Sequence, residues 1–139
     1  MSFVYFTDRD LGKRFPEILR TAGLRVERHP DHFAHDAPDT KWLEAVGKHG
    51  WIVLTHDRRV RYKPNELNAV IEHGIALLVI VGKASFPNLA RAFVASVAVI
   101  EGFLVRHKPP FIAKVYRPSP AEVARRASAP GRVELWYPG

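Results

Sequence analysis

All six aspartates of this basic chain lie within its first 57 residues. Three of them stand beside predicted elements: Asp8 follows the β-prone run Val4–Thr7, Asp57 follows the apolar run Trp51–Thr55, and Asp39 begins a helical pattern. Carboxylates that converge repel one another, and a shared divalent cation is the usual remedy. Because oxygen ligands favour Mg²⁺ or Mn²⁺ over zinc, the spacing suggests a site for one of these cations.

Each aspartate also has a simpler interpretation. Asp39 could be only the N-cap of its helix, and Asp8 only a turn residue. Asp57 could be only the ion-pair partner of Arg58 or Arg61. The presence of all three aspartates at element ends favours the cation site, because a charged side chain there costs free energy and the fold itself does not require one.

A basic loop follows Asp57 at once, and a second group of cations follows Asp8. The candidates for phosphate contacts are Arg9, Lys13, Arg58, Arg59, Arg61 and Lys63. Tyr62 lies among them and could stack on a base. The alternative is a solvated loop whose cations balance the nearby acids.

Three histidines recur at every third position, at His29, His32 and His35. Zinc binding there is conceivable, but Pro30 and the surrounding small polar residues predict a loop without the one-sided geometry of a helix. We therefore expect solvent or partner contacts at these histidines.

Apolar runs alternate with helical patterns along the chain, which predicts an α/β fold with a mainly parallel sheet. The expected strands are 4–7, 24–29, 51–55, 75–81 and 111–116, and the expected helices are 11–22, 39–47, 64–73 and 88–105. Sites in such sheets form beyond the carboxyl ends of the strands. If the strands ending near Asp8 and Asp57 are neighbours, these two carboxylates and Asp39 converge.

The expected helix 88–105 is apolar nearly all round, which indicates a buried helix or one shared with a second subunit. Charged residues bracket a run too short to span a bilayer, so we expect no membrane insertion. Residues 118–139 form a basic tail with one possible short helix at 121–127. We expect a domain over 1–117 and a tail that packs on it or on a partner.

Composition sets the outer limits. The chain has 139 residues, 47% of them hydrophobic and 25% charged, which suits one globular domain. It has no cysteine, so disulfides and thiolate chemistry are excluded. Its start lacks the pattern of a secretory signal. The net charge of +7 favours a polyanionic partner such as nucleic acid, although it could also only maintain solubility.

Three segments resemble the PIN-like domains, and more closely the short VapC-type toxins: Phe6–Gly12, Asp39–Val46 and Ile52–Arg58. The resemblance covers about residues 3–81. It implies a PIN-like three-layer α/β/α fold and a metal-dependent endoribonuclease, usually the cytoplasmic toxin of a toxin–antitoxin pair. It also implies that Asp8, Asp39 and Asp57 hold one or two Mg²⁺ or Mn²⁺ ions, with Thr55 beside them. RNA would be the substrate and an antitoxin the partner, and a homodimer is possible.

The sequence departs from the PIN-like pattern in its fourth acid. Larger members carry a glutamate on an intermediate helix, which has no match here, and Arg59 stands where many have a second acid. A fourth carboxylate must then be Asp10, Asp36 or Glu66, and we expect Asp10 because it is near Asp8. The missing acid keeps a non-catalytic module that binds RNA or a partner as an alternative.

A phosphoacceptor receiver domain is the remaining alternative. It would use Asp8 and Asp10 after the first strand, Asp57 after the third, and the pair Lys108–Pro109. Against it, Asp57 precedes two arginines where a receiver loop is usually apolar, and Asp39 would have no role.

Overall fold

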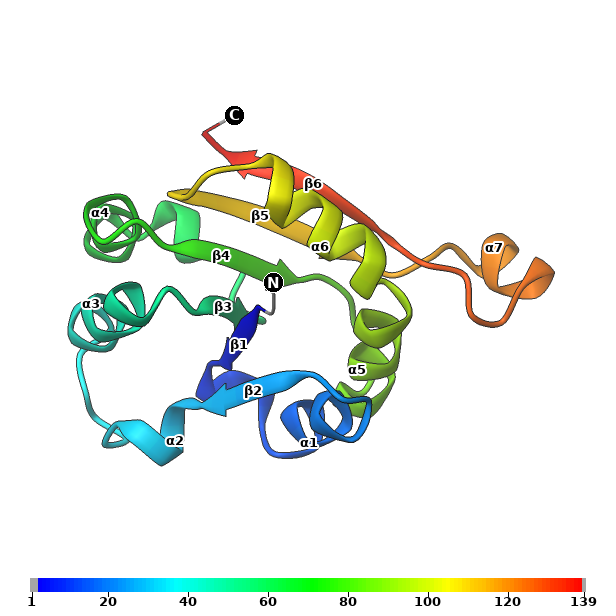
Figure 1. Cartoon of the computed structure of the whole chain (residues 1–139), viewed down its shortest axis with the longest axis horizontal. Helices are drawn as coiled ribbons and strands as arrows, with labels where there is room; N and C mark the ends of the chain where they lie inside the picture. The colour runs from blue at the N-terminus through cyan, green and yellow to red at the C-terminus, as the bar shows by residue number, and fades with distance from the viewer. Residues whose placement is uncertain (1–2, 139) are drawn as a thin grey trace.

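A six-stranded sheet forms the centre of the protein, which the computed structural model describes over residues 3–138 (Figure 1). Its strands are β1 (Val4–Thr7), β2 (Arg25–Arg28), β3 (Ile52–Thr55), β4 (Ala76–Ile80), β5 (Phe111–Tyr116) and β6 (Arg132–Tyr137). Their spatial order is β2-β1-β3-β4-β5-β6. The first five are parallel, and β6 is antiparallel to β5.

Helices cover both faces of the sheet. They are α1 (Arg14–Thr21), α2 (His29–His32), α3 (Asp39–His49), α4 (Pro64–Glu72), α5 (Phe86–Ala95), α6 (Val97–Arg106) and α7 (Pro120–Arg125), with 3₁₀ turns η1 (Arg9–Leu11) and η2 (Val60–Tyr62). In Figure 1, α1, α5 and α6 lie on one side of the sheet and α3 and α4 on the other. The three-layer α/β/α prediction is therefore confirmed.

Two hydrophobic clusters, one on each face, hold the layers together. Phe15 and Phe93 pack with Tyr5 on the face of α1 and α5. Trp42 and Phe6 pack on the face of α3. Every residue of β3 and β4 is buried, as the continuous apolar runs predict for strands covered on both faces.

The single long helix expected over 88–105 is wrong. The chain breaks at Ser96 into α5 and α6, which are bent by 65°. The buried Ser96 hydroxyl donates to the Ala92 carbonyl at 2.8 Å and accepts from the Gly131 amide at 2.9 Å, so it serves α5 and the C-terminal segment together. Among the described residues, no one helix has the length and apolarity needed to cross a membrane, although the bent α5–α6 pair together meets those criteria.

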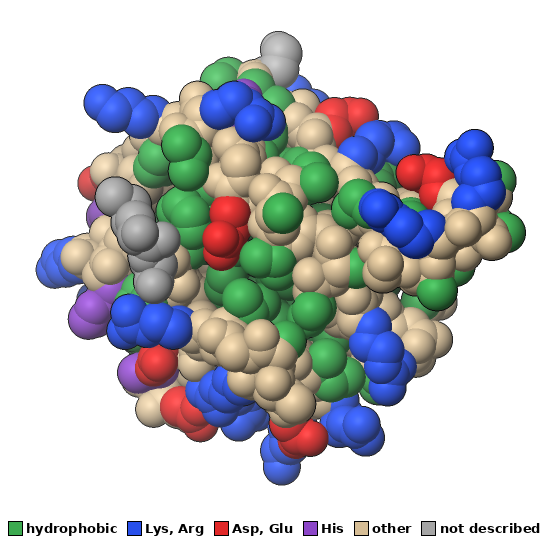
Figure 2. Space-filling model, turned by 45° about the vertical axis from the view of Figure 1, so that its right-hand side comes forward, with side chains coloured by type: hydrophobic (Ala, Val, Ile, Leu, Met, Phe, Trp, Pro, Cys, Tyr) green, Lys and Arg blue, Asp and Glu red, His purple; other side chains and the backbone are tan. Residues whose placement is uncertain are grey.

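The α6 helix exposes Val105 to 76% and Val99 to 37%. Figure 2, which brings the α5–α6 side forward, shows hydrophobic side chains in the middle of this face and Lys and Arg side chains around it. The α6 helix is therefore only partly buried.

The segment after β5 is more ordered than the sequence analysis expected. The possible helix at 121–127 forms α7, which has a capping box between Ser119 and Glu122. Beyond it, β6 adds an edge strand that the sequence analysis did not predict. The expected loop after β2 also contains the short helix α2.

Candidate functional site

The strand register brings the first two acidic segments together. Thr7 of β1 pairs with Leu54 of β3, and the Asp8 amide donates to the Leu54 carbonyl at 3.0 Å. Asp8 therefore lies beside Thr55, at the carboxyl edge of the parallel sheet. The predicted neighbourhood of these two strands is confirmed, and it places Asp8 and Asp57 at one edge.

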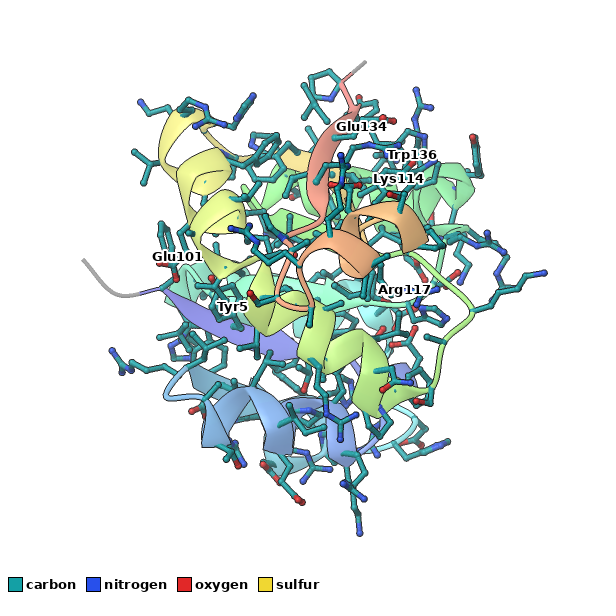
Figure 3. All side chains as sticks on the ribbon, turned by 90° about the vertical axis from the view of Figure 1, so that its right-hand side faces the viewer. Tyr5, Glu101, Lys114, Arg117, Glu134 and Trp136 are labelled. Atoms are coloured by element: carbon teal, nitrogen blue, oxygen red, sulfur yellow. The ribbon has the colours of Figure 1, made fainter. Side chains whose placement is uncertain are left out.

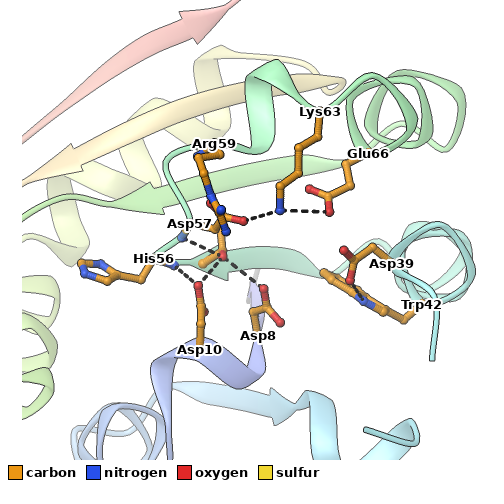
Figure 4. A network of polar contacts seen from close by, with 10 residues as sticks. Asp8, Asp10, Asp39, Trp42, His56, Asp57, Arg59, Lys63 and Glu66 are labelled. Carbon is orange, nitrogen blue, oxygen red and sulfur yellow. Dashed lines mark hydrogen bonds and ion pairs between the residues drawn. The ribbon is translucent and has the colours of Figure 1, made fainter. Parts of the chain in front are cut away.

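The first half of the site consists of Asp8 and Asp10, which Figure 4 labels, and of Thr55, whose hydroxyl connects them. Its hydroxyl donates to Asp8 Oδ2 at 3.1 Å and to Asp10 Oδ2 at 3.0 Å. It accepts a hydrogen bond from the Asp57 amide at 3.2 Å. Because a hydroxyl has one proton, Thr55 shares it between two carboxylates and orients both.

The second half of the site consists of Asp39, Asp57 and Glu66, and Lys63 connects the last two. Its Nζ lies 2.8 Å from Asp57 Oδ2 and 3.5 Å from Glu66 Oε1 (Figure 4). Asp39, the first residue of α3, lies next to Glu66 and accepts from Trp42 Nε1 at 2.8 Å. The ammonium of Lys63 thus provides the positive charge between two of these acids.

A small pocket opens between the two halves. Its volume is about 30 Å³, which is enough to admit a water-sized group. Four carboxylates line it: Asp8, Asp39, Asp57 and Glu66. Thr55 lies in the same lining, and Asp10 adjoins it through the Thr55 hydroxyl. Room for one small group among carboxylate oxygens suits a hard divalent cation.

The acids are held apart by their present partners. Within residues 3–138, no three carboxylate or imidazole groups already surround a common point as ligands would. Hydrogen bonds from Thr55, Trp42 and Lys63 hold the acids in these positions. The acids therefore supply the oxygen ligands that Mg²⁺ or Mn²⁺ prefers, but in this structure they are not arranged as a coordination sphere.

The first half of the site carries charge that is poorly compensated. Burial and the neighbouring Asp10 raise the pKa of Asp8 to about 6. Desolvation likewise raises the pKa of Asp10, against the hydrogen bonds from Thr55 and His56. A cation between these acids would remove the repulsion that raises their pKa values.

The second half is compensated by hydrogen bonds. Burial would raise the pKa of Asp57, but hydrogen bonds from Lys63 and Arg59 outweigh it and lower the pKa. Burial and a proton shared with Asp39 raise the pKa of Glu66, and the same shared proton lowers the pKa of Asp39. Glu66 is therefore the acid of this pair that keeps its proton to the higher pH, and Asp39 is the one that ionises first.

The stability of the metal-free protein is expected to fall as the pH rises from about 5 to about 8. Asp8 has an ordinary pKa of 3.8 and a folded pKa of about 6, so the folded state holds this extra proton up to about pH 6. The pKa of Glu66, raised to about 8, extends the window to about pH 8. Losing the Asp8 proton lowers the free energy of unfolding by about 1–2 kcal/mol, and Glu66 acts in the same direction. The lowered pKa of Asp57 acts only below about pH 4.

Thermal unfolding in EDTA and in Mg²⁺ checks this expectation. Buried His29 has a lowered pKa and works in the opposite direction, but equally with and without the cation. The increase of Tm caused by Mg²⁺ should therefore be larger at about pH 8 than at about pH 5. An increase that is the same at both pH values would contradict it.

The six basic candidates fall into two groups. Lys13 and Arg58 are exposed to solvent. Four others have contacts within the fold: Arg9 donates to the Phe33 carbonyl, Arg59 and Lys63 bind Asp57, and Arg61 lies over aromatic rings. Part of the basic loop therefore balances the charge of the acidic site, which agrees with the alternative interpretation of this loop.

The three histidines at 29, 32 and 35 lie in different surroundings. His29 is 2% exposed and packs against Phe6, Phe33 and Trp42. His32 Nε2 lies 2.7 Å from Glu27, and His35 is exposed. His29 is thus a core residue in contact with Trp42, which in turn holds Asp39.

The three candidates for a fourth acid also separate. Asp36 is exposed and lies outside the pocket lining. Asp10 adjoins Asp8 through Thr55, and Glu66 lies in the lining itself. Glu66 was one of three candidates from the sequence, but its position depends on α4, which begins at Pro64 and places Glu66 beside Lys63 and Asp39.

This combination of a parallel α/β sheet and an acidic pocket at its carboxyl edge defines a PIN-like domain, a nuclease-type fold. The model of the family described as "PIN like domain" matches residues 3–82, and the chain belongs to this family. The matched range includes every acid of the pocket and ends after β4. No curated protein and no solved structure gives a significant match.

The family and the geometry disagree with a receiver domain. Lys108 precedes β5, so it lies at the amino end of that strand. The acids lie at the carboxyl ends of β1 and β3. The lysine that the alternative requires is therefore at the opposite edge of the sheet.

Proposed function

We propose that this protein is a metal-dependent endoribonuclease that uses Mg²⁺ or Mn²⁺. One observation carries the proposal: four carboxylates from four separate segments line one pocket of about 30 Å³ in a PIN-like domain. A fold gains nothing from gathering like charges unless a ligand compensates for them. The basic surface beside the pocket favours a polyanionic substrate.

In this proposal Asp8, Asp39 and Asp57 hold the cation, with Glu66 as the fourth acid and Asp10 beside it. When bound, the cation supplies positive charge against the phosphodiester and lowers the pKa of the attacking water. Thr55 keeps the Asp8 and Asp10 carboxylates oriented by its shared hydroxyl proton.

The basic loop positions the substrate. Arg58, which is exposed, is available for a phosphate oxygen, and so is Lys13 at the start of α1. Arg59 and Lys63 bind Asp57 and so connect the loop to the acids. Binding of the RNA backbone by the loop is thereby coupled to whether the acids hold a cation.

Incubation of the purified protein with structured and single-stranded RNA tests the proposal. We expect cleavage in Mg²⁺ or Mn²⁺, none in EDTA, and recovery when the cation is restored. Asp39→Asn should lose this activity, whereas Asp31→Asn, on the surface, should keep it. Intact RNA under every cation, with Mn²⁺ still bound, would refute catalysis and support the non-catalytic module.

The resemblance to VapC-type toxins adds a cellular role to the proposal. We propose that the protein acts in the cytoplasm as a toxin that an antitoxin partner inhibits, and that it can form a homodimer. Induced expression should then arrest growth, and the Asp39→Asn variant should not. Growth arrest by wild type and by Asp39→Asn alike would contradict an RNA-cleaving toxin.

A further inference from the structure

The outer face of β5 and β6 lies beyond the range that the family model matches. On one face of these strands, Ala113 and Val115 are buried with α5 and α6. On the other face, the register pairs Lys114 with Glu134 and Tyr116 with Arg132, and these side chains remain half-buried or exposed. This second face therefore presents polar and aromatic groups to solvent.

Aromatic rings and cations alternate across this face. Lys114 Nζ lies 4.2 Å from the ring centre of Trp136, and the Arg132 guanidinium carbon lies 4.1 Å from that of Tyr116. Figure 3 shows Lys114 and Trp136 side by side on the strands, with Glu134 nearby. Cations over rings are held by the ring electrons, and they leave part of each group open to a ligand.

The loop of the acidic site reaches the same face. Tyr62 of η2 meets Trp136 edge to face, with ring centres 5.7 Å apart, and its own side chain is 70% exposed. The Arg61 guanidinium lies 5.6 Å from the Trp136 ring centre. We call Arg61, Tyr62, Lys114 and Trp136 the aromatic platform.

The platform continues into the acidic site through one residue. Tyr62 is followed by Lys63, whose Nζ lies 2.8 Å from Asp57 Oδ2. A strand of nucleic acid whose backbone passes Asp57 therefore runs beside the residue that follows Tyr62. The two cations of the platform can attract the phosphates of such a strand, and the exposed Tyr62 ring and the half-buried Trp136 ring can contact its bases.

We propose that the aromatic platform is a base-stacking subsite for single-stranded RNA, in which Tyr62 and Trp136 contact bases and Arg61 and Lys114 contact phosphates. The inference rests on the proposed function in taking RNA as the ligand. It goes further in assigning a binding role to β5 and β6, outside the matched domain. Stacking tolerates any base, so the platform predicts affinity without strict sequence preference.

Fluorescence anisotropy in EDTA tests the platform apart from cleavage. The probe is a short labelled oligoribonucleotide, compared with an abasic analogue that has the same phosphates. Tyr62→Ala should weaken binding of the normal probe about tenfold, and Tyr62→Phe should retain it. The abasic analogue should bind weakly and equally to wild type and Tyr62→Ala.

Trp136→Ala should weaken binding by a similar factor, with Trp136→Phe as its control. Trp136 also packs at the rim of the core, so the exposed Tyr62 carries the test independently of folding. Equal binding of the normal and abasic probes by wild type would overturn the inference, because only phosphate contacts would then remain. Unchanged binding by Tyr62→Ala would overturn it as well.

The outcomes separate this inference from the proposed function. If wild type cleaves RNA but Tyr62→Ala binds the probe as wild type does, the platform fails and the nuclease stands. If no cation supports cleavage but base-dependent binding persists in EDTA, the nuclease fails and the platform stands.

Discussion

Asp8→Asn is expected to lower metal-dependent RNA cleavage about 100-fold to 1,000-fold, because it removes one charged ligand from the pocket. Asparagine keeps the shape of the side chain. Its carboxamide oxygen can still accept from the Arg9 amide, which lies 2.7 Å from Asp8 Oδ1. The NH2 group of asparagine cannot accept the hydrogen bond that the Thr55 hydroxyl gives to Asp8 Oδ2, but that hydroxyl can still donate to Asp10. The loss of activity therefore reports the missing charge together with one hydrogen bond from Thr55.

The same substitution should stabilise the metal-free protein at neutral pH. The raised pKa of Asp8 means that its ionised form is disfavoured in the fold by burial and by Asp10. A neutral side chain avoids that repulsion, so the free energy of unfolding should rise by about 1–2 kcal/mol in EDTA. The stabilisation that Mg²⁺ gives to wild type should shrink in the variant.

Cleavage rates and thermal unfolding of Asp8→Asn and Asp31→Asn check both effects together. Asp31 is exposed and makes only surface ion pairs with Arg20 and Arg28, so its variant should resemble wild type. Full activity of Asp8→Asn would remove Asp8 from the metal site. A loss of activity that comes with loss of folding would contradict the predicted gain of stability.

Gly131→Ala is expected to lower the free energy of unfolding by about 2–4 kcal/mol. A Cβ on Gly131 would overlap the backbone carbonyl of Tyr116, at the end of β5. The backbone cannot move aside there without cost, because the Gly131 amide donates to the buried Ser96 hydroxyl at 2.9 Å. The substitution should therefore detach the start of β6 from the sheet.

Gly102→Ala is the matched control. The nearest atom to its new Cβ is Arg106 Nη1 at 3.3 Å, the end of a flexible side chain, and the position is within α6. Alanine is favoured over glycine there by up to about 1 kcal/mol. Urea unfolding and limited proteolysis compare the two variants. Equal stability of both would show that β6 adds nothing to the fold.

The positions of Asp8 and Asp57 were predictable from sequence because strand ends are local signals. A run of apolar residues followed by an acid identifies the end of a buried strand, and parallel strands place such ends at one edge. The resemblance to PIN-like domains rests on the same segments, and the family match over residues 3–82 agrees with it. Local pattern and register sufficed for this half of the site.

Glu66 and Lys63 required the tertiary structure. Their roles depend on how α4 docks beside α3, which brings Glu66 against Asp39 across 27 positions of sequence. The hydrophobic pattern of α4 defines its buried face but not the partner that its polar residues meet. The pairing of Lys63 with Asp57 likewise depends on the turn η2 between them.

The break at Ser96 and the strand β6 also came from long-range contacts. Apolar residues continue across Ser96, so the local pattern predicts one helix, whereas the bond from Gly131 to the Ser96 hydroxyl joins segments 35 positions apart. The residues of β6 are all exposed or half-buried, so no buried apolar run marks the strand in the sequence, and its place in the sheet depends on pairing with β5. The sequence by itself determined the parallel strands β1 to β5, the helices α1, α3 and α4, and the acids that follow β1 and β3. Only the tertiary structure decided which distant side chains meet, since such meetings depend on packing between elements and leave no local pattern.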